Sequence, residues 1–206
     1  MSNFEIGINF IESEVGLVDR LQVGSEEAFE TLMHLYKVPV YNIAYRVLGD
    51  PSEAADAVQE TFIKIYKGIK SFRGDCGLKT WIYKIAISET LNRQRWWRRW
   101  GRRASVSLDE PVGPSCGRAL PLDLPDSHPD PEAHLAAIET ERAVQKALSH
   151  LSFEFRLVVV LRDIEGLSYD EISETLGLSL GTVKSRLWRG RLELKKELHE
   201  FVNGRS

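Results

Sequence analysis

Apolar residues recur at helical spacing along the N-terminal half of the chain. In the stretch 26–48 they fall on one stripe of a helix, at Phe29, Leu32, Met33, Tyr36 and Val40. Ser25 can cap the start of this helix, and Gly49 stops it. No stretch shows the strict alternation that is typical of a half-buried strand. The pattern therefore predicts helices throughout this half.

Two further helices are predicted before residue 104. Asp50, Pro51 and Glu53 supply an N-cap acid, a proline at the first helical position and an acid at the third, which favours a helix start. The side chains expected to face inward from this helix are Val58, Phe62, Ile65 and Tyr66. After a turn at 72–77, a third helix is expected to begin near Lys79. It buries Trp81, Ile82, Ile85 and Ala86 and then continues into a basic segment.

The sharpest local motif is "LSYDEISETLGLSLGTVKSRLWRGRLELKKEL", near the C-terminal end. Ser168 and Glu171 form a capping box that opens a short helix. Ser179 can cap a second helix, in which Val183 and Leu187 face the first. This spacing predicts a helix-turn-helix, whose second helix enters the major groove of DNA.

A proline-rich stretch divides the chain into two parts. Six of the eight prolines lie between residues 104 and 134, together with six acidic residues and a single arginine. Such a composition cannot bury enough apolar surface to fold alone. Helices around 135–151 and 154–164 are expected to complete the second part, although the valine run 158–160 has strand propensity. We therefore expect an all-α protein with two small helical domains, 19–103 and 135–206, an acidic linker at 104–134 and an extension at 1–18.

Charge is concentrated in two basic islands, although the net charge of the chain is −3. The segment "NRQRWWRRWGRR" (92–103) holds six arginines and three tryptophans without an acid, and 181–196 carries six basic residues against one acid. Two such islands predict two surfaces that meet a polyanion. Arginines hold phosphates, and aromatic faces accept unstacked bases at about 1–3 kcal/mol per base.

Several classes of protein find little support in the sequence. The five histidines are scattered, and the motifs of metalloproteases, P-loops, nucleophile elbows and dinucleotide sites are missing. Neither an enzyme nor a cofactor or metal site is expected. Cys76 and Cys116 stand in no C-x-x-C context, which argues against a disulfide framework and against zinc. The sequence shows no export signal and no apolar stretch of membrane-spanning length, so a cytoplasmic protein without membrane insertion is expected.

Two blocks of sequence together resemble a known family. "DAVQETFIKIYKGIKSFRGDCGLKTWIYKIA" is followed by a proline-rich linker and "LRDIEGLSYDEISETLGLSLGTVKSRLWRGRLEL". In this order and separation they resemble a bacterial RNA polymerase sigma factor of the extracytoplasmic-function (ECF) group, over about 19–198. The resemblance implies a promoter-specificity subunit that binds core RNA polymerase at its β′ clamp helices and β flap. It also implies duplex and single-stranded promoter DNA, and an anti-sigma factor, as partners.

The resemblance assigns three sets of residues. The predicted polymerase-binding residues are Asp56, Gln59, Glu60, Phe62 and Lys64. The predicted minus-ten residues, which help to melt and read that promoter element, are Phe72, Lys79, Ser88, Asn92, Arg93, Arg95, Trp96, Trp97, Arg98 and Arg99. The predicted minus-thirty-five residues are Thr182, Lys184, Ser185, Arg186, Trp188 and Arg189. Many relatives have an asparagine where this chain has Ser88, a shorter side chain with fewer donors, so the identity of the flipped base stays open.

Alternatives remain at this point. A transcription regulator that binds a duplex operator through the helix-turn-helix alone would also explain the C-terminal motif. The basic-aromatic segment and the docking helix argue against it, because a regulator more often carries a ligand pocket or phosphoacceptor domain there. Asp56 and Glu60 can be an ordinary solvated helix face, and at least one of the three tryptophans at 96–100 is expected to pack against its own domain. The first eighteen residues have no assigned role.

Overall fold

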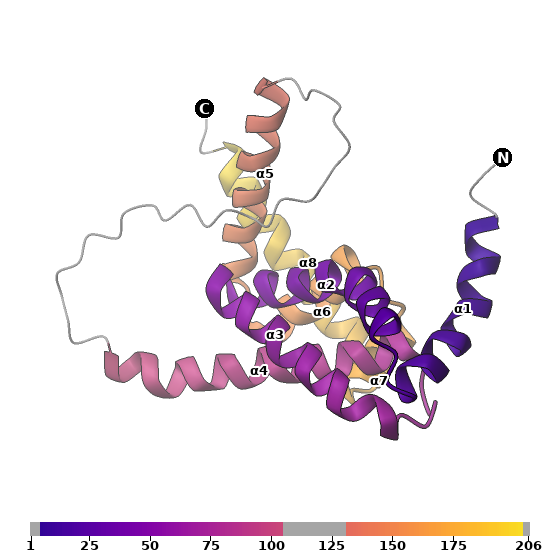
Figure 1. Ribbon diagram of the computed structural model, residues 1–206. Helices are drawn as coiled ribbons and strands as arrows, with labels where there is room; N and C mark the ends of the chain where they lie inside the picture. Colours follow the sequence, from indigo (N-terminus) through magenta and orange to yellow (C-terminus); the bar gives the residue numbers. More distant parts are fainter. Residues whose placement is uncertain (1–4, 105–130, 204–206) are drawn as a thin grey trace.

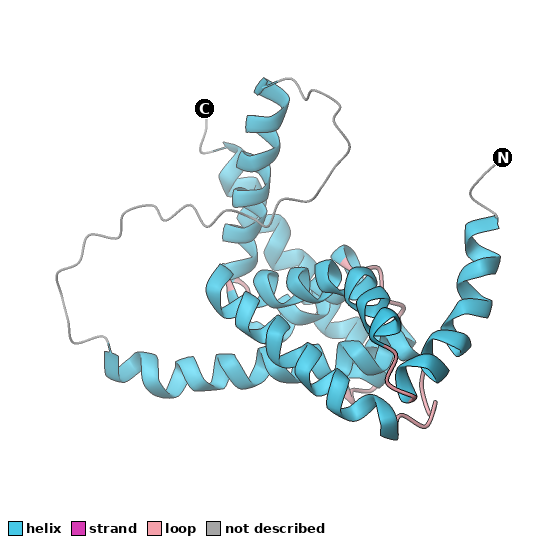
Figure 2. Ribbon diagram, viewed as in Figure 1, coloured by secondary structure: helices cyan, strands magenta, loops and turns pink. Residues whose placement is uncertain are grey.

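Figure 1 shows the computed structural model, which describes the backbone of residues 5–104 and 131–203 and the side chains of residues 14–95 and 138–199. The N-terminal half contains α1 (Glu5–Gln22), α2 (Glu26–Leu48), α3 (Pro51–Gly68), the 3-10 turn η1 (Ile69–Ser71) and α4 (Leu78–Ala104). The C-terminal half contains α5 (Pro131–His150), α6 (Phe153–Val159), the π-helical turn η2 (Val160–Ile164), α7 (Tyr169–Leu176) and α8 (Leu180–Asn203). The described residues include no strand, which confirms the all-α prediction (Figure 2).

The predicted helix ends are present as capping bonds. The Ser25 hydroxyl accepts a hydrogen bond from the amide of Ala28, and the Asp50 carboxylate accepts one from the amide of Glu53 at 2.9 Å. Gly49 ends α2 with φ of 78°, a left-handed conformation that glycine adopts without a steric cost. These bonds replace the helical partners that the first amides of α2 and α3 lack.

The N-terminal core lies between α2, α3 and α4. Leu32, Ile43, Ile65 and Ile82 are fully buried there. The prediction that Tyr66 faces inward is wrong, because its side chain is 62% exposed. Tyr66 instead meets the ring of Phe29 edge-on at 5.2 Å between centroids, at the surface between α2 and α3.

The valine run 158–160 is helical despite its strand propensity. All three side chains are buried, in the last turn of α6 and the start of η2. Burial against neighbouring helices outweighs the modest intrinsic preference of β-branched residues for strands. Helix α5 begins at Pro131, four residues before the expected start at 135, because proline suits the first turn of a helix. The remainder of the predicted linker, 105–130, lies outside the described residues.

The two halves share one hydrophobic core, in which Leu32 and Ile82 belong to the same cluster as Leu148 and Leu161. Polar bonds also join them. The guanidinium of Arg156 donates to the carbonyl of Val47 at 2.6 Å, in the last turn of α2. On the other side of the contact, Lys84 of α4 pairs with Glu174 of α7 at 3.0 Å. The predicted domains therefore pack against each other in this structure.

Candidate nucleic-acid and docking interfaces

The predicted polymerase-binding residues lie on α3. The side chains of Asp56, Gln59, Glu60 and Lys64 are exposed, whereas Phe62 is buried. The spacing explains the difference, because residues three or four positions apart share a helix face and Phe62 falls on the inward face. Four of the five side chains are therefore accessible to a partner. Phe62 instead lines a groove between α2 and α3, so a partner would contact it only from within that groove.

That groove lies between α2 and α3 and was not predicted. It has a volume of about 450 Å³ and an almost wholly apolar lining, which includes Phe29, Met33, Val58, Phe62, Ile63 and Tyr66. The sequence analysis had placed most of these residues in the core. Along the groove Phe29 and Met33 are half-buried and Ile63 and Tyr66 are exposed, whereas Val58 and Phe62 are buried at its floor. The spacing of apolar residues alone does not distinguish a covered stripe from an uncovered one.

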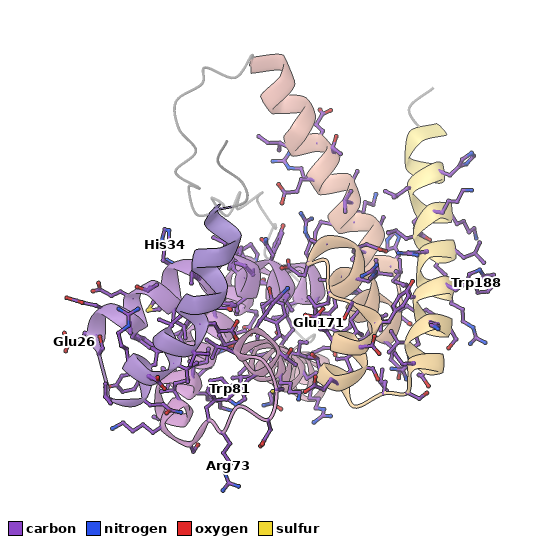
Figure 3. The ribbon with its side chains drawn as sticks, turned by 90° about the vertical axis from the view of Figure 1, so that its right-hand side faces the viewer. Glu26, His34, Arg73, Trp81, Glu171 and Trp188 are labelled. Carbon is purple, nitrogen blue, oxygen red and sulfur yellow. The ribbon has the colours of Figure 1, made fainter. Side chains whose placement is uncertain are left out.

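The turn that precedes α4 is held at both ends by α1. The side-chain amide of Gln22 donates to the carbonyl of Phe72 at 2.8 Å, and the carboxylate of Glu14 accepts from the amide of Leu78 at 3.0 Å. The ring of Phe72 packs on Trp81, with 5.1 Å between centroids. Part of the predicted extension therefore positions the loop that the sequence assigns to promoter melting, a role that the sequence analysis missed. Arg73, in this loop, points away from the protein (Figure 3).

Apart from Arg93, the predicted minus-ten residues of α4 divide into three groups. Ser88, Asn92 and Arg95 are exposed, and their spacing of four and three places them on one face of the helix. Lys79 is half-buried, with its ammonium group 5.7 Å from the centroid of the Tyr83 ring. Trp96, Trp97, Arg98 and Arg99 lie in α4 but outside the residues whose side chains are described.

Arg93 faces α3 instead of sharing the exposed face. Its Nη1 atom lies 2.8 Å from Oε2 of Glu53 and 2.9 Å from Oδ2 of Asp56. Burial disfavours the charged guanidinium, but the hydrogen bond to Glu53 and the charge of Asp56 outweigh this effect and raise the pKa of Arg93. The structure thus joins a predicted minus-ten residue to a predicted polymerase-binding residue.

A second ion pair connects the same two helices. The ammonium group of Lys64 lies 2.6 Å from Oε1 of Glu89, which is buried, and the amide of Asn92 donates to the same oxygen at 3.4 Å. Glu53 and Glu89 had no assigned role, because ion pairs between residues 25 to 40 positions apart leave no local signal in a sequence.

The helix-turn-helix is present at the predicted place. The Ser168 hydroxyl and the Glu171 carboxylate cap each other's backbone amides, and this bonding lowers the pKa of Glu171. Helix α7 ends at Gly177, which has φ of 64°, and the Ser179 hydroxyl accepts from the amide of Thr182 at the start of α8. Ile172, Val183 and Leu187 are buried between the two helices, which fixes the angle at which α8 is presented.

The predicted minus-thirty-five residues lie along the first half of α8. Lys184, Ser185, Trp188 and Arg189 are exposed, and Trp188 projects away from the protein (Figure 3). Thr182 and Arg186 are half-buried. Arg186 pairs with Glu154 of α6 at 2.7 Å, so its guanidinium is directed toward the protein's own surface. Four of the six side chains are therefore accessible to duplex DNA.

Two other features are absent from the part of the chain that the structure describes. No group of three or more histidine, cysteine, aspartate and glutamate side chains could hold a metal ion there. None of the described helices combines the length and the apolar character needed to cross a membrane.

Comparison with known proteins decides the family. Residues 32–103 match Sigma-70 region 2, and residues 141–194 match Sigma-70, region 4. The ECF RNA polymerase sigma factor SigW of Bacillus subtilis is 33% identical over 184 residues, which cover 89% of this chain and 96% of SigW. This chain belongs to the ECF sigma factors. The RNA polymerase sigma-H factor of Pseudomonas aeruginosa is also 33% identical to this ECF sigma factor, over 191 residues. The matched residues cover 93% of the present chain and 96% of the sigma-H factor.

Solved structures support the same fold. CnrH, in complex with the cytosolic domain of CnrY, superposes on this ECF sigma factor with a TM-score of 0.64 at 23% identity, covering 90% of this chain and 97% of CnrH. The sigma factor RpoE of Bartonella quintana, in complex with the anti-sigma factor NepR, gives 0.61 at 24% identity, covering 83% and 96%. As an ECF sigma factor, the chain is a promoter-specificity subunit of RNA polymerase.

Proposed function

We propose that this sigma factor docks on the clamp helices of core RNA polymerase through the outer face of α3, melts and reads the minus-ten element with the loop at 72–77 and α4, and reads the minus-thirty-five element with α8. The observation that carries the proposal is that three rows of polar side chains, on α3, α4 and α8, remain exposed while the opposite faces of these helices are buried. In this proposal the domain 19–103 docks on polymerase and melts the minus-ten element, and the domain 135–206 recognises the minus-thirty-five element.

The melting step follows from the chemistry of α4. A protein that opens a duplex without hydrolysing a nucleotide must bind the separated strand better than the paired one. Exposed polar side chains at Ser88, Asn92 and Arg95 are available for base edges and phosphates, and the segment continues with arginines and tryptophans that suit single strands. No cofactor or catalytic residue enters this proposal, and its site of action is the cytoplasm, where polymerase and chromosome meet.

An anti-sigma factor is a further proposed partner. The support comes from the two solved relatives, since RpoE was captured with the anti-sigma factor NepR and CnrH with the cytosolic domain of CnrY. The operator-binding regulator considered from the sequence finds no support, because the chain matches both sigma regions.

Reconstituted transcription tests the proposed function directly. Core RNA polymerase with and without the purified sigma factor is supplied with fragmented genomic DNA from the source organism, and transcript starts are mapped by sequencing. New starts that share two upstream elements at a fixed spacing are expected. Binding to core without any such start would overturn the proposal.

Reversing the charge of the α3 face is expected to prevent docking. Asp56→Arg with Glu60→Arg should weaken binding to core polymerase about 100-fold, because like charges facing each other across an interface cost several kcal/mol. The affinity is measured with labelled sigma factor and purified core. Glu26→Arg with Glu30→Arg is the matched control, since these exposed acids of α2 have the same spacing and the same change of charge. Equal affinities for the two double variants would show that another surface docks.

Removing one side chain of α8 is expected to change promoter preference. Arg189 is exposed in the first half of α8, and a bidentate arginine–guanine pair discriminates by about 1–3 kcal/mol. Arg189→Ala should therefore relax selection at one position of the minus-thirty-five element in a randomised promoter library. Lys195→Ala, at an exposed position on a different face of α8, should lower yield without altering the selected sequence. An unchanged preference in Arg189→Ala would exclude base reading by this residue.

A further inference from the structure

The ion pairs between α3 and α4 leave a local excess of negative charge at Arg93. One guanidinium is shared by two carboxylates, at 2.8 Å for Glu53 and 2.9 Å for Asp56. The side chain of Glu53 is 18% exposed and that of Arg93 is 26% exposed, so solvent screens this cluster less than a fully exposed one. The cluster of Glu53, Asp56 and Arg93 has a formal charge of −1.

This charge opposes the use that the proposed function gives to α4. Arg93 follows Asn92 directly, and Asn92 lies on the exposed face with Ser88 and Arg95. A phosphate that approaches Arg93 itself meets a cluster of one positive and two negative groups. Carboxylates and phosphates are alternative partners for the same guanidinium, and both make charge-assisted hydrogen bonds to it. The cluster therefore weakens nucleic-acid binding at the first arginine of the basic segment.

The two carboxylates differ in accessibility. Asp56 is 52% exposed and belongs to the predicted polymerase-binding face, whereas Glu53 sits in the first turn of α3 and is mostly covered. A cationic group of the polymerase that pairs with Asp56 would neutralise the cluster without displacing Glu53. Docking and DNA affinity are then linked through one aspartate, because binding at one site changes the free energy of binding at the other.

We propose that Glu53 and Asp56 form an electrostatic brake on Arg93, which lowers the affinity of the sigma factor for DNA when it is alone and is relieved when polymerase binds Asp56. The brake rests on the proposed function, since it requires α3 to dock and α4 to bind DNA. Its role is to favour promoter binding by the assembled enzyme over binding by free sigma factor.

The test measures binding of a fluorescent single-stranded oligonucleotide of mixed sequence to the full-length sigma factor. Glu53→Gln keeps the shape of the side chain and removes its charge. It should raise affinity about fivefold at low salt, the size expected for releasing the Arg93 guanidinium from one partly exposed ion pair so that it can bind a phosphate. The salt dependence should steepen by about 0.7 in the slope of log K against log salt, as for one additional phosphate contact to a single strand.

Three controls make the outcome specific. Glu30→Gln changes the net charge equally at an exposed position of α2 and should leave affinity within about twofold of wild type, because a distant exposed charge is screened. In an Arg93→Gln background, Glu53→Gln should have no effect beyond that of Glu30→Gln. Asp56→Asn should act in the same direction as Glu53→Gln, which keeps the test valid if the latter variant folds poorly.

Promoter binding by the holoenzyme distinguishes failure of the brake from failure of the proposed function. With core polymerase bound, Glu53→Gln should improve promoter binding no more than twofold, because docking has already relieved the brake. If free Glu53→Gln binds DNA no better than Glu30→Gln, or if the gain survives in Arg93→Gln, the brake does not exist. A full fivefold gain in the holoenzyme would overturn the link to polymerase. Failure of the wild-type holoenzyme to bind any promoter would instead overturn the proposed function.

Discussion

Gly190→Ala is expected to destabilise the C-terminal half by about 2 kcal/mol, even though alanine is the better helix former. Gly190 is buried in α8 where this helix crosses α6. A β-carbon built there would lie 2.8 Å from Cγ2 of Val159 and 3.2 Å from Cβ of Phe155. Val159 is itself buried and β-branched, so it has little freedom to move aside. The two helices must therefore separate or distort.

The control for this substitution is Gly181→Ala, in the first turn of the same helix. Apart from its chain neighbours and the backbone of its own helix, the nearest atom to the added β-carbon is Oγ of Ser179, at 4.0 Å. This variant should be as stable as wild type or more stable by up to about 1 kcal/mol, from helix propensity alone. Urea unfolding followed by circular dichroism measures both. Equal midpoints for the two variants would show that α6 and α8 are not packed as closely as the structure indicates.

Arg156→Ala is expected to cost about 3 kcal/mol and to loosen the contact between the halves. The half-buried guanidinium donates to the carbonyls of Val47 at 2.6 Å, Ser149 at 2.7 Å and Leu151 at 3.1 Å. Its loss leaves these acceptors without that donor, and a buried polar group without a partner costs about 1–3 kcal/mol. The bond to Val47 is the one that crosses between the halves. Its removal should therefore increase the radius of gyration measured by X-ray scattering.

Arg162→Ala is the control that distinguishes a general loss of stability from a loss of the contact between the two halves. Arg162 also donates to a backbone carbonyl, that of Leu167 at 2.6 Å, but both residues belong to the C-terminal half. This control should lower the free energy of unfolding without changing the radius of gyration. A radius that is unchanged in Arg156→Ala, or equally increased in both variants, would contradict the role given to Arg156.

Helix starts and the helix-turn-helix could be predicted because their signals are local. Asp50 caps the amide of Glu53 three residues later, and Ser168 caps that of Glu171, so each signal lies within a few residues of sequence. The family resemblance added the order of the two regions, which the comparisons confirmed. The exposed stripe of α8 also follows from spacing, once Val183 and Leu187 are known to face inward.

The parts that escaped prediction all depend on contacts between distant segments. Tyr66 was expected in the core, but its side chain is exposed at the groove between α2 and α3. The ion pair of Arg93 with Glu53 could not be predicted either, because Glu53 lies 40 residues earlier in the sequence. The extension 1–18 had no predicted role, and the bond from the Leu78 amide to the Glu14 carboxylate supplies one, 64 residues apart in the sequence. Such pairings are set by how the helices pack and leave no periodic signal along the chain.

Because both halves share one core, exchanging one region of this protein for that of a relative has a structural cost. Leu148 and Leu161 pack in one cluster with Leu32 and Ile82. Arg156 donates a hydrogen bond to the carbonyl of Val47 in the other half. A chimera that takes region 4 from another sigma factor would keep the sequence of each region intact. It would nevertheless bring together two surfaces that were not selected for each other. In such a hybrid the mismatch would affect the packing of the two halves in the free protein, so that folding yield, rather than promoter choice, would be the first property to suffer.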